Sequence, residues 1–291
     1  MRGTADAFFR RRMKAGPREK IVSADPAQVS DEEVLCALLG VRPERGLVRR
    51  LLAEFGGVRE VIAAGPGAWA EFLLFPAGAL NHKVPKSIPA HHAVFIEPLA
   101  CSIHAVERGE IQYQDTVVIA GCGPLGIGMI AAAKMKGPER IIAIDLNDER
   151  LKLARRCGAD LGINPRQVDA VAQVRELTGG YGCDVYIEAT GHPAAVEQGL
   201  QMIRKLGTFV EFSVMREKVT VDWTIIGDSK ELNVHGAHLG PYCYPVAIRM
   251  LEQELLPMDE IVTHRLPLTD FQQGIDLVIS GKTSVKVTME P

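Results

Sequence analysis

The 291-residue chain lacks the cysteine spacing and the long apolar runs that mark whole classes of protein. Its six cysteines are scattered with no C-x-x-C pair, so neither a disulfide framework nor a cysteine zinc knuckle is predicted. No apolar stretch is long enough to span a bilayer, and the basic N-terminus lacks the apolar core of a signal peptide. We therefore expect a cytoplasmic protein with reduced thiols and no membrane partner.

A strong net charge is also absent, since the formal net charge is −3. A nearly neutral chain gives no general reason to expect binding to nucleic acid. The charge is unevenly distributed, however, because residues 1–67 hold 12 Lys and Arg residues against 9 Asp and Glu residues. Contact with nucleic acid therefore stays open for this segment only. The sequence also contains no P-loop and no Ser-His-Asp elbow, which removes two common catalytic designs.

Residues 1–67 are predicted to form a small helical segment. Ser30 and Glu33 form a capping box at the start of SDEEVLCALLG, in which the two side chains satisfy free backbone donors at a helix N-terminus. A second helical pattern, LVRRLLAEF, stops at Gly56-Gly57. After the GPG stretch the pattern changes, and WAEFLLF and HKVP are predicted as strands. We therefore place a domain boundary at residue 68.

From residue 115 onward, strand patterns alternate six times with helical patterns. The predicted strands are 116–121, 141–145, 161–164, 184–189, 207–212 and 232–237. Nearly continuous apolar strands separated by amphipathic helices are typical of a parallel sheet that is covered on both faces. The sequence therefore predicts an α/β domain over residues 115–258, with a doubly wound, six-stranded parallel sheet of the Rossmann type.

A glycine motif at the end of the first strand predicts a nucleotide site. In G-C-G-P-L-G, Gly121 permits the tight turn, Gly123 lets the backbone approach a pyrophosphate, and Gly126 lets the helix pack close to the strand. Asp145 follows at the tip of the next strand, where an acid meets the adenosine ribose and repels the extra phosphate of NADP. The pattern therefore predicts NAD as the cofactor. The alternative is a glycine-rich turn without a ligand.

Residues 69–291 resemble the medium-chain zinc-type alcohol dehydrogenases, specifically the sorbitol, threitol and erythritol group. The stretches that carry the resemblance are FIEPLACSIHAVERG, VVIAGCGPLGIG, LTGGYGCDVYIEATG, ELNVHGAHLGPYCYPVAIRMLE and IVTHRLPLTDFQQGIDLVISGKTSVKVTMEP. The resemblance implies an NAD-dependent oxidoreductase that takes hydride from a small-molecule polyol or secondary alcohol, with zinc as a second cofactor. It also implies a homo-oligomer in which strand 232–237 pairs between subunits.

Further contacts with the coenzyme are implied by the resemblance. Arg150 matches the basic position beside the adenosine, and Lys286 matches a cationic contact to the pyrophosphate. The other implied positions line the turn and the cleft toward the nicotinamide: Pro124, Leu125, Thr190, Gly191, Phe212, Ser213, Ala237 and Leu239. Alternatively, Arg150 and Lys286 could be surface charges, and the EATG stretch could be an ordinary strand end.

The zinc site of that family is only partly matched. Its zinc polarises the alcohol oxygen, and Glu97, the acid of the EPL motif, matches the member that binds zinc directly or through water. The family's other ligands, a cysteine and a His-Glu pair, belong to a GroES-like β domain. Residues 68–114 and 259–291 are expected to be a remnant of that domain, with residues 1–67 in place of its front portion. We therefore expect an incomplete zinc site, impaired turnover, and a Glu97 that is solvated, protonated or paired with a base.

Two other interpretations of possible metal ligands stay open. Glu97, Cys101 and His104 are spaced i, i+4, i+7 and could offer a metal two or three ligands from one face of a helix. Alternatively, Cys101 and His104 simply pack. The pair His91-His92, like His82, lies in Pro-flanked sequence and is expected to be exposed in a loop.

The N-terminal segment supports a second hypothesis about function. Residues 1–67 resemble the helix-hairpin-helix part of RadC-type proteins in SDEEVLCALLG and LLAEFGGVREVIAAG. This resemblance would make the chain a non-catalytic NAD(H)-binding fusion protein, with a helical module that contacts DNA or protein. The other interpretation of the segment is a small helical appendage with a solvated basic face.

Overall fold

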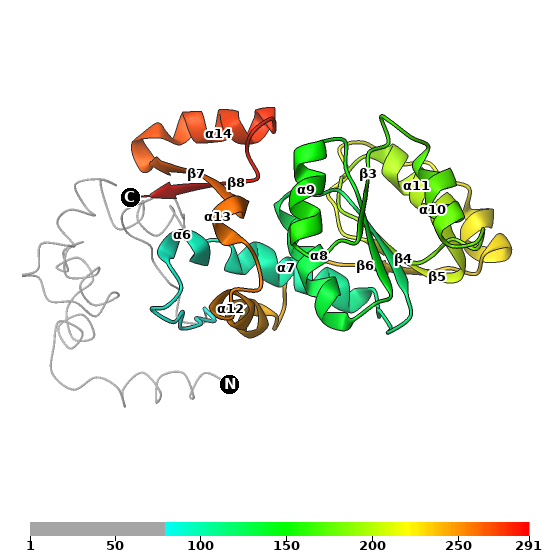
Figure 1. The fold of residues 1–291 in the computed structure, drawn as a ribbon, viewed down its shortest axis with the longest axis horizontal. Coiled ribbons are helices and arrows are strands. Elements are labelled where there is room, and N and C mark those ends of the chain that lie inside the picture. Colours follow the sequence, from blue (N-terminus) through cyan, green and yellow to red (C-terminus); the bar gives the residue numbers. More distant parts are fainter. Residues whose placement is uncertain (1–78, 291) are drawn as a thin grey trace, which may run out of the picture. The chain divides into compact units, whose positions relative to one another are not determined.

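The computed structural model describes residues 79–290 (Figure 1). Residues from Leu80 onward form one compact unit. The predicted helical segment 1–67 and the predicted strand WAEFLLF lie outside the described residues. Within the described part of the chain, no helix is long and apolar enough to cross a membrane.

Six parallel strands form the main sheet, in the order β3-β2-β1-β4-β5-β6. Their bounds are β1 Thr116–Ala120, β2 Arg140–Ile144, β3 Leu161–Ile163, β4 Cys183–Glu188, β5 Ile203–Glu211 and β6 Asn233–Gly236. All five residues of β1 are buried, as expected for a central strand covered on both faces. The strand order reverses between β1 and β4, which makes the carboxyl ends of these two strands the switch point. The predicted doubly wound, six-stranded fold is confirmed.

The sheet is covered on both faces by helices (Figure 1). These are α8 Pro124–Lys136, α9 Asp148–Arg156, α10 Ala170–Leu177 and α11 Pro193–Met202. Alternate residues of β1 enter two separate cores, since Val117 and Ile119 pack with α8 and α9 while Val118 and Ala120 pack with α10 and α11. This alternation explains why the strand patterns are continuously apolar.

A helix that precedes the sheet supports the start of α8. This helix, α7 Ile96–Arg108, packs against α8 and against α12 Tyr244–Glu252, and the short helix α6 Ala90–Ala93 comes before it. The Ser102 hydroxyl of α7 lies 2.8 Å from the Leu125 carbonyl oxygen and 2.9 Å from the Pro98 carbonyl oxygen. The close approach of α7 to α8 depends on Gly128 of α8, because an added Cβ there would lie 2.5 Å from Ser102 Oγ. The EPL helix and the glycine motif are therefore joined in one core.

A second, smaller sheet holds two parallel strands, β7 Val262–Pro267 and β8 Lys286–Glu290. The other elements of the described chain are α13 Met258–Ile261, η4 Leu268–Asp270, α14 Phe271–Ser280 and the π-helical turn η3 Ile225–Ser229. Helix α14 connects β7 to β8 and packs on both. The prediction of a strand at HKVP was wrong, because residues 82–85 pair with no strand. Pro85, the last of these residues, has no N–H group to donate to a neighbouring strand.

Candidate functional site

The glycine motif forms a tight turn between β1 and α8. Gly121 has φ +97°, and a Cβ there would lie 2.6 Å from the Ala189 carbonyl oxygen. A Cβ at Gly126 would overlap the Gly121 carbonyl oxygen. At Gly123, by contrast, a Cβ would meet nothing within 4 Å. Packing therefore requires two of the glycines, whereas the third borders open space.

Helix α8 begins at this open space. Gly123 is its N-cap residue, and no side chain accepts a hydrogen bond from the N–H groups of the first turn. Pro124 occupies the first turn, where its missing N–H costs nothing. A 13-residue helix with uncapped N–H groups favours an anion at its N-terminus. The turn therefore has the backbone donors and the free space that a pyrophosphate requires.

Asp145 links the end of β2 to the glycine turn. Its Oδ2 accepts a hydrogen bond from the Cys122 backbone N–H at 2.7 Å, and its Oδ1 accepts one from the Asn147 backbone N–H at 2.8 Å. Asn147 in turn caps α9 by accepting from the Glu149 N–H at 2.9 Å. An ionised carboxylate has about four acceptor positions, so each oxygen of Asp145 keeps capacity for a hydroxyl donor.

A cavity of about 780 Å³ lies at the switch point and brings predicted cofactor residues together. Those that line it are Gly121, Gly123, Asp145, Arg150 and Thr190. Gly126 is buried beneath the turn. The space and its lining fit a dinucleotide, because an open glycine, a helix N-terminus and the carboxylate of Asp145 border one cavity at the carboxyl ends of the strands.

Arg150 is half-buried and fixed beside this cavity. Its Nη2 donates to the carbonyl oxygens of Gly281, at 3.2 Å, and Ser284, at 3.3 Å. Its Nε is buried and makes no hydrogen bond within the described structure. The arginine therefore ties α9 to the loop that follows α14, and it keeps one donor without a partner.

Three further cations of the cavity were missed by the sequence reasoning. Arg166, Arg216 and Lys282 are exposed side chains from three separate loops, and all three line the cavity. No local motif marks them, because they are separated by 50 residues or more in the sequence. With Arg150 they give the cavity lining four cationic side chains against one carboxylate, Asp145, which suits a ligand that carries phosphate groups.

The sequence reasoning also missed Glu211 and its pairing with Glu188, the first residue of EATG, at the ends of β4 and β5. Glu188 and Glu211 are partners in the parallel register. Glu188 is fully buried and accepts hydrogen bonds from the Thr190 N–H, at 2.7 Å, and from the Gly191 N–H, at 3.2 Å. Burial and then the charge of Glu188 raise the pKa of Glu211 to about 7, and Glu211 Oε1 has no hydrogen-bond partner. The EATG turn is therefore built on a buried carboxylate.

The remaining predicted cofactor residues lie outside the cavity lining. Phe212 and Ser213 follow β5, and their N–H and hydroxyl groups lie 3.3 and 3.4 Å from the Glu188 carbonyl oxygen. Ala237 follows β6 and donates its N–H to the Glu211 carbonyl oxygen at 2.9 Å, while Leu239 is 58% exposed. These positions gather at the carboxyl ends of β5 and β6.

Lys286 lies at the start of β8. Burial lowers the pKa of the Lys286 ammonium group, and the charge of Glu97 opposes that shift. The opposing effect means that Lys286 and Glu97 lie within electrostatic range of each other. No ion pair joins these two side chains within the described residues, although they influence each other's charge.

Glu97 itself is exposed in the first turn of α7. Cys101, one turn later, is buried and donates its thiol to Glu97 Oε1 at 3.2 Å. Burial, followed by the contact with Glu97, raises the pKa of Cys101 to about 12, so the thiol stays protonated. Among residues 79–290, Glu97 and Cys101 belong to no group of three side chains that could hold a metal. These residues alone therefore do not fit the zinc site that the EPL motif implies.

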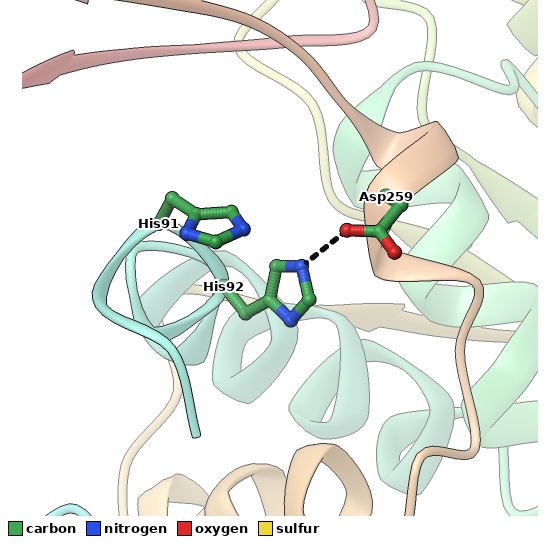
Figure 2. A group of neighbouring side chains, drawn as sticks. All are labelled: His91, His92 and Asp259. Atoms are coloured by element: carbon green, nitrogen blue, oxygen red, sulfur yellow. Dashed lines mark hydrogen bonds and ion pairs between the residues drawn. The ribbon is translucent and has the colours of Figure 1, made fainter. Parts of the chain in front are cut away.

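The described residues place a three-ligand cluster elsewhere. His91 and His92 were expected to be exposed, but both are half-buried in α6. Asp259 of α13 faces them, and His92 Nε2 lies 2.9 Å from Asp259 Oδ1 (Figure 2). One ligand atom from each side chain lies within 4.8 Å of those of the other two. The His-His dipeptide was a signal in the sequence, but Asp259 is 167 positions from His92.

Comparison with known proteins finds a family match that begins at Pro124, directly after the glycine turn. Residues 124–253 match the family model described as zinc-binding dehydrogenase. The matched residues make up less than half of the chain. The erythritol/L-threitol dehydrogenase of Mycolicibacterium smegmatis is 62% identical over 226 residues, which cover 78% of this chain and 62% of that protein.

Two solved structures of dehydrogenases share the fold. The 2R,3R-butanediol dehydrogenase of Bacillus subtilis has a TM-score of 0.67 and 29% identity, over 72% of this chain and 60% of that chain. A short chain alcohol dehydrogenase of Escherichia coli CFT073, complexed with NADH, has a TM-score of 0.66 and 25% identity, over 72% of this chain and 62% of that chain. The chain thus spans less than two thirds of the length of each of these three dehydrogenases.

Proposed function

We propose that the chain binds NAD in the cavity of about 780 Å³ and serves hydride transfer between NAD and a small polyol or secondary alcohol. The observation that carries the proposal is the open face of Gly123, which borders the same cavity as Asp145 and the N-terminus of α8. When bound, NAD supplies the hydride acceptor. The chain's own residues hold and orient the dinucleotide.

Each part of the cavity has a distinct task in this proposal. The uncapped N–H groups of α8 receive the pyrophosphate at Gly123. Asp145 accepts from the adenosine ribose hydroxyls with the lone pairs left over by Cys122 and Asn147. Arg150 lies beside the adenosine end, fixed by its bonds to the loop 281–284. The positions after β5 and β6, together with Thr190 and Gly191, border the nicotinamide end.

We assign a polyol as the substrate class, because the M. smegmatis relative that is 62% identical is an erythritol/L-threitol dehydrogenase. Zinc is the second cofactor expected of such an enzyme, with Glu97 as the member of its site that this chain carries. We further propose that turnover by this chain alone is impaired. The support is the exposed Glu97, which belongs to no group of three possible metal ligands among residues 79–290.

The second candidate function is a non-catalytic NAD(H)-binding protein. The same observation at Glu97 favours it, since coenzyme binding needs only the switch point whereas oxidation also needs a completed zinc site. Contact with DNA or protein would then fall to residues 1–67, which lie outside the described residues. Both candidates share a cytoplasmic location, which we infer from the five unpaired, buried cysteines within residues 79–290.

Both candidates also allow a homo-oligomer through the edge of the sheet. β6 is the last strand in the sheet order, and within the described chain only β5 pairs with it. Three of its four residues are exposed. An exposed edge strand with free backbone groups is a template for pairing with a second copy.

One set of assays on the purified full chain distinguishes the two candidate functions. NADH is titrated by its fluorescence, and oxidation of erythritol and L-threitol is followed with NAD in the presence and absence of added Zn²⁺. We expect saturable NADH binding, weaker binding of NADPH, and little oxidation. Substantial Zn²⁺-dependent oxidation would overturn the proposed impairment. A chain that binds neither NADH nor NADPH would overturn both candidates.

A further inference from the structure

The cluster of His91, His92 and Asp259 offers a donor set that suits a metal ion. Two imidazole nitrogens and one carboxylate oxygen all lie within 4.8 Å of one another. Figure 2 shows the two rings on the same side of α6, with the Asp259 carboxylate facing them from α13. Imidazole and carboxylate together are the usual ligands of Zn²⁺ and related divalent transition metals.

Local structure fixes the two histidines beside each other. Pro89 is the N-cap residue of α6, and the His92 N–H donates to its carbonyl oxygen at 2.9 Å. The two rings are 4.3 Å apart at their centres and meet edge to face. Both side chains are half-buried, so part of the loss of side-chain freedom on binding a metal has already occurred. The rings therefore form a pair that is prepared for a shared ligand.

Asp259 supplies the negative charge from the opposite element. Its Oδ1 lies 2.9 Å from His92 Nε2, which is close to the separation of neighbouring ligand atoms around a bound metal. The Asp259 side chain is 88% exposed, so water can occupy a fourth position. Glu290 at the end of β8 lies within electrostatic range of His91, although Arg265 holds that carboxylate at 2.7 Å.

We propose that His91, His92 and Asp259 bind one divalent transition-metal ion, with Zn²⁺ as the cation that fits best, and that this ion joins α6 to α13. The site is distinct from the position of Glu97, because Glu97 lies on α7 and shares no cluster with these three side chains. It does not depend on coenzyme binding either, so the proposed function and the metal site can fail separately. The plain ion pair between His92 and Asp259 is the competing interpretation.

The test is a Zn²⁺ titration of the full chain against a chromophoric chelator, without NADH. We expect one Zn²⁺ per wild-type chain. Since even partners outside the ligand shell change metal affinity by about 10- to 100-fold, loss of a ligand in His91→Ala or Asp259→Asn should weaken binding by at least about tenfold. Asp259→Asn keeps the size of the side chain and an acceptor for His92, so it also guards against a folding artefact in His91→Ala.

Two matched variants control the assignment. His82→Ala removes an exposed histidine that stacks on Tyr244 at 5.5 Å and lies outside the cluster, and Glu97→Gln removes the family's metal-site acid. Both should leave the Zn²⁺ affinity within about twofold of wild type. Substitution with Co²⁺ should give visible absorption bands that disappear in His91→Ala. The proposal is overturned by a wild-type chain that binds no Zn²⁺, by undiminished binding in both cluster variants, or by loss of binding in Glu97→Gln.

Discussion

The coenzyme cavity and the surroundings of Glu97 differ in how complete they are within the described chain. At the cavity, the turn, the acid and the helix N-terminus are held by short backbone contacts, such as the 2.7 Å bond from Cys122 N–H to Asp145. At Glu97, one exposed carboxylate is accompanied by a thiol whose pKa is raised to about 12. The difference teaches that most of a dinucleotide site can be built from one turn and the acid after the next strand, whereas a metal site depends on side chains that must be brought from several elements.

The largest expected effect comes from the packed side of the glycine turn. A side chain at Gly126 would overlap the Gly121 carbonyl oxygen, so Gly126→Val should lower the free energy of unfolding by about 3 kcal/mol or more. Denaturant unfolding followed by circular dichroism measures this loss. The matched control is Gly227→Val, since a Cβ at Gly227 meets nothing within 4 Å. Equal stability of the two variants would break the argument that packing fixes the turn.

A smaller effect, dependent on pH, is expected at the carboxyl ends of β4 and β5. The folded state holds the pKa of Glu211 at about 7 instead of 4.5, chiefly through burial and then through the charge of Glu188. Because the folded state favours the neutral acid, wild-type stability should fall as the pH rises through this interval. Glu211→Gln removes the loss, so it should be more stable than wild type by about 1–2 kcal/mol near pH 8, after allowance for solvent screening of a half-buried group.

Denaturant unfolding at low and high pH checks this prediction. Near pH 4 the Gln variant and wild type should have nearly equal free energies of unfolding, because the folded and unfolded wild-type acids are then both largely protonated. Glu197→Gln, at an exposed acid of α11, is the matched control and should show no comparable gain at high pH. If the free energy of unfolding of Glu211→Gln near pH 8 is no higher than that of wild type, burial and Glu188 do not destabilise the ionised Glu211.

The cavity could be predicted largely from the sequence because its chemistry is local. G-C-G-P-L-G occupies consecutive positions, and Asp145 follows at the end of the next strand, so strand periodicity places both at one edge of the sheet. The cations Arg166 and Arg216 could not be predicted in the same way. They come from separate loops, and only the folded chain brings them to one cavity.

The acid pair and the histidine cluster show the limit of pattern reasoning. Glu188 and Glu211 each resemble an ordinary strand end, and their interaction arises only from the parallel register of β4 and β5. His91-His92 was visible as a dipeptide, but it was expected to be exposed because prolines flank it. Its partner Asp259 depends on how α13 packs toward α6, which sequence periodicity does not specify.

Coenzyme binding in the cavity depends most directly on the open side of the glycine turn. Gly123 has φ −70° and ψ −174°, a conformation that a valine can adopt, and a Cβ there meets no atom of the described chain within 4 Å. Gly123→Val should therefore keep the wild-type unfolding transition, while NADH affinity measured by fluorescence titration falls by at least about a hundredfold, because the side chain occupies the space for the pyrophosphate. NADH affinity should be unchanged in Gly227→Val. A folded Gly123→Val protein that binds NADH as tightly as wild type would contradict the central claim.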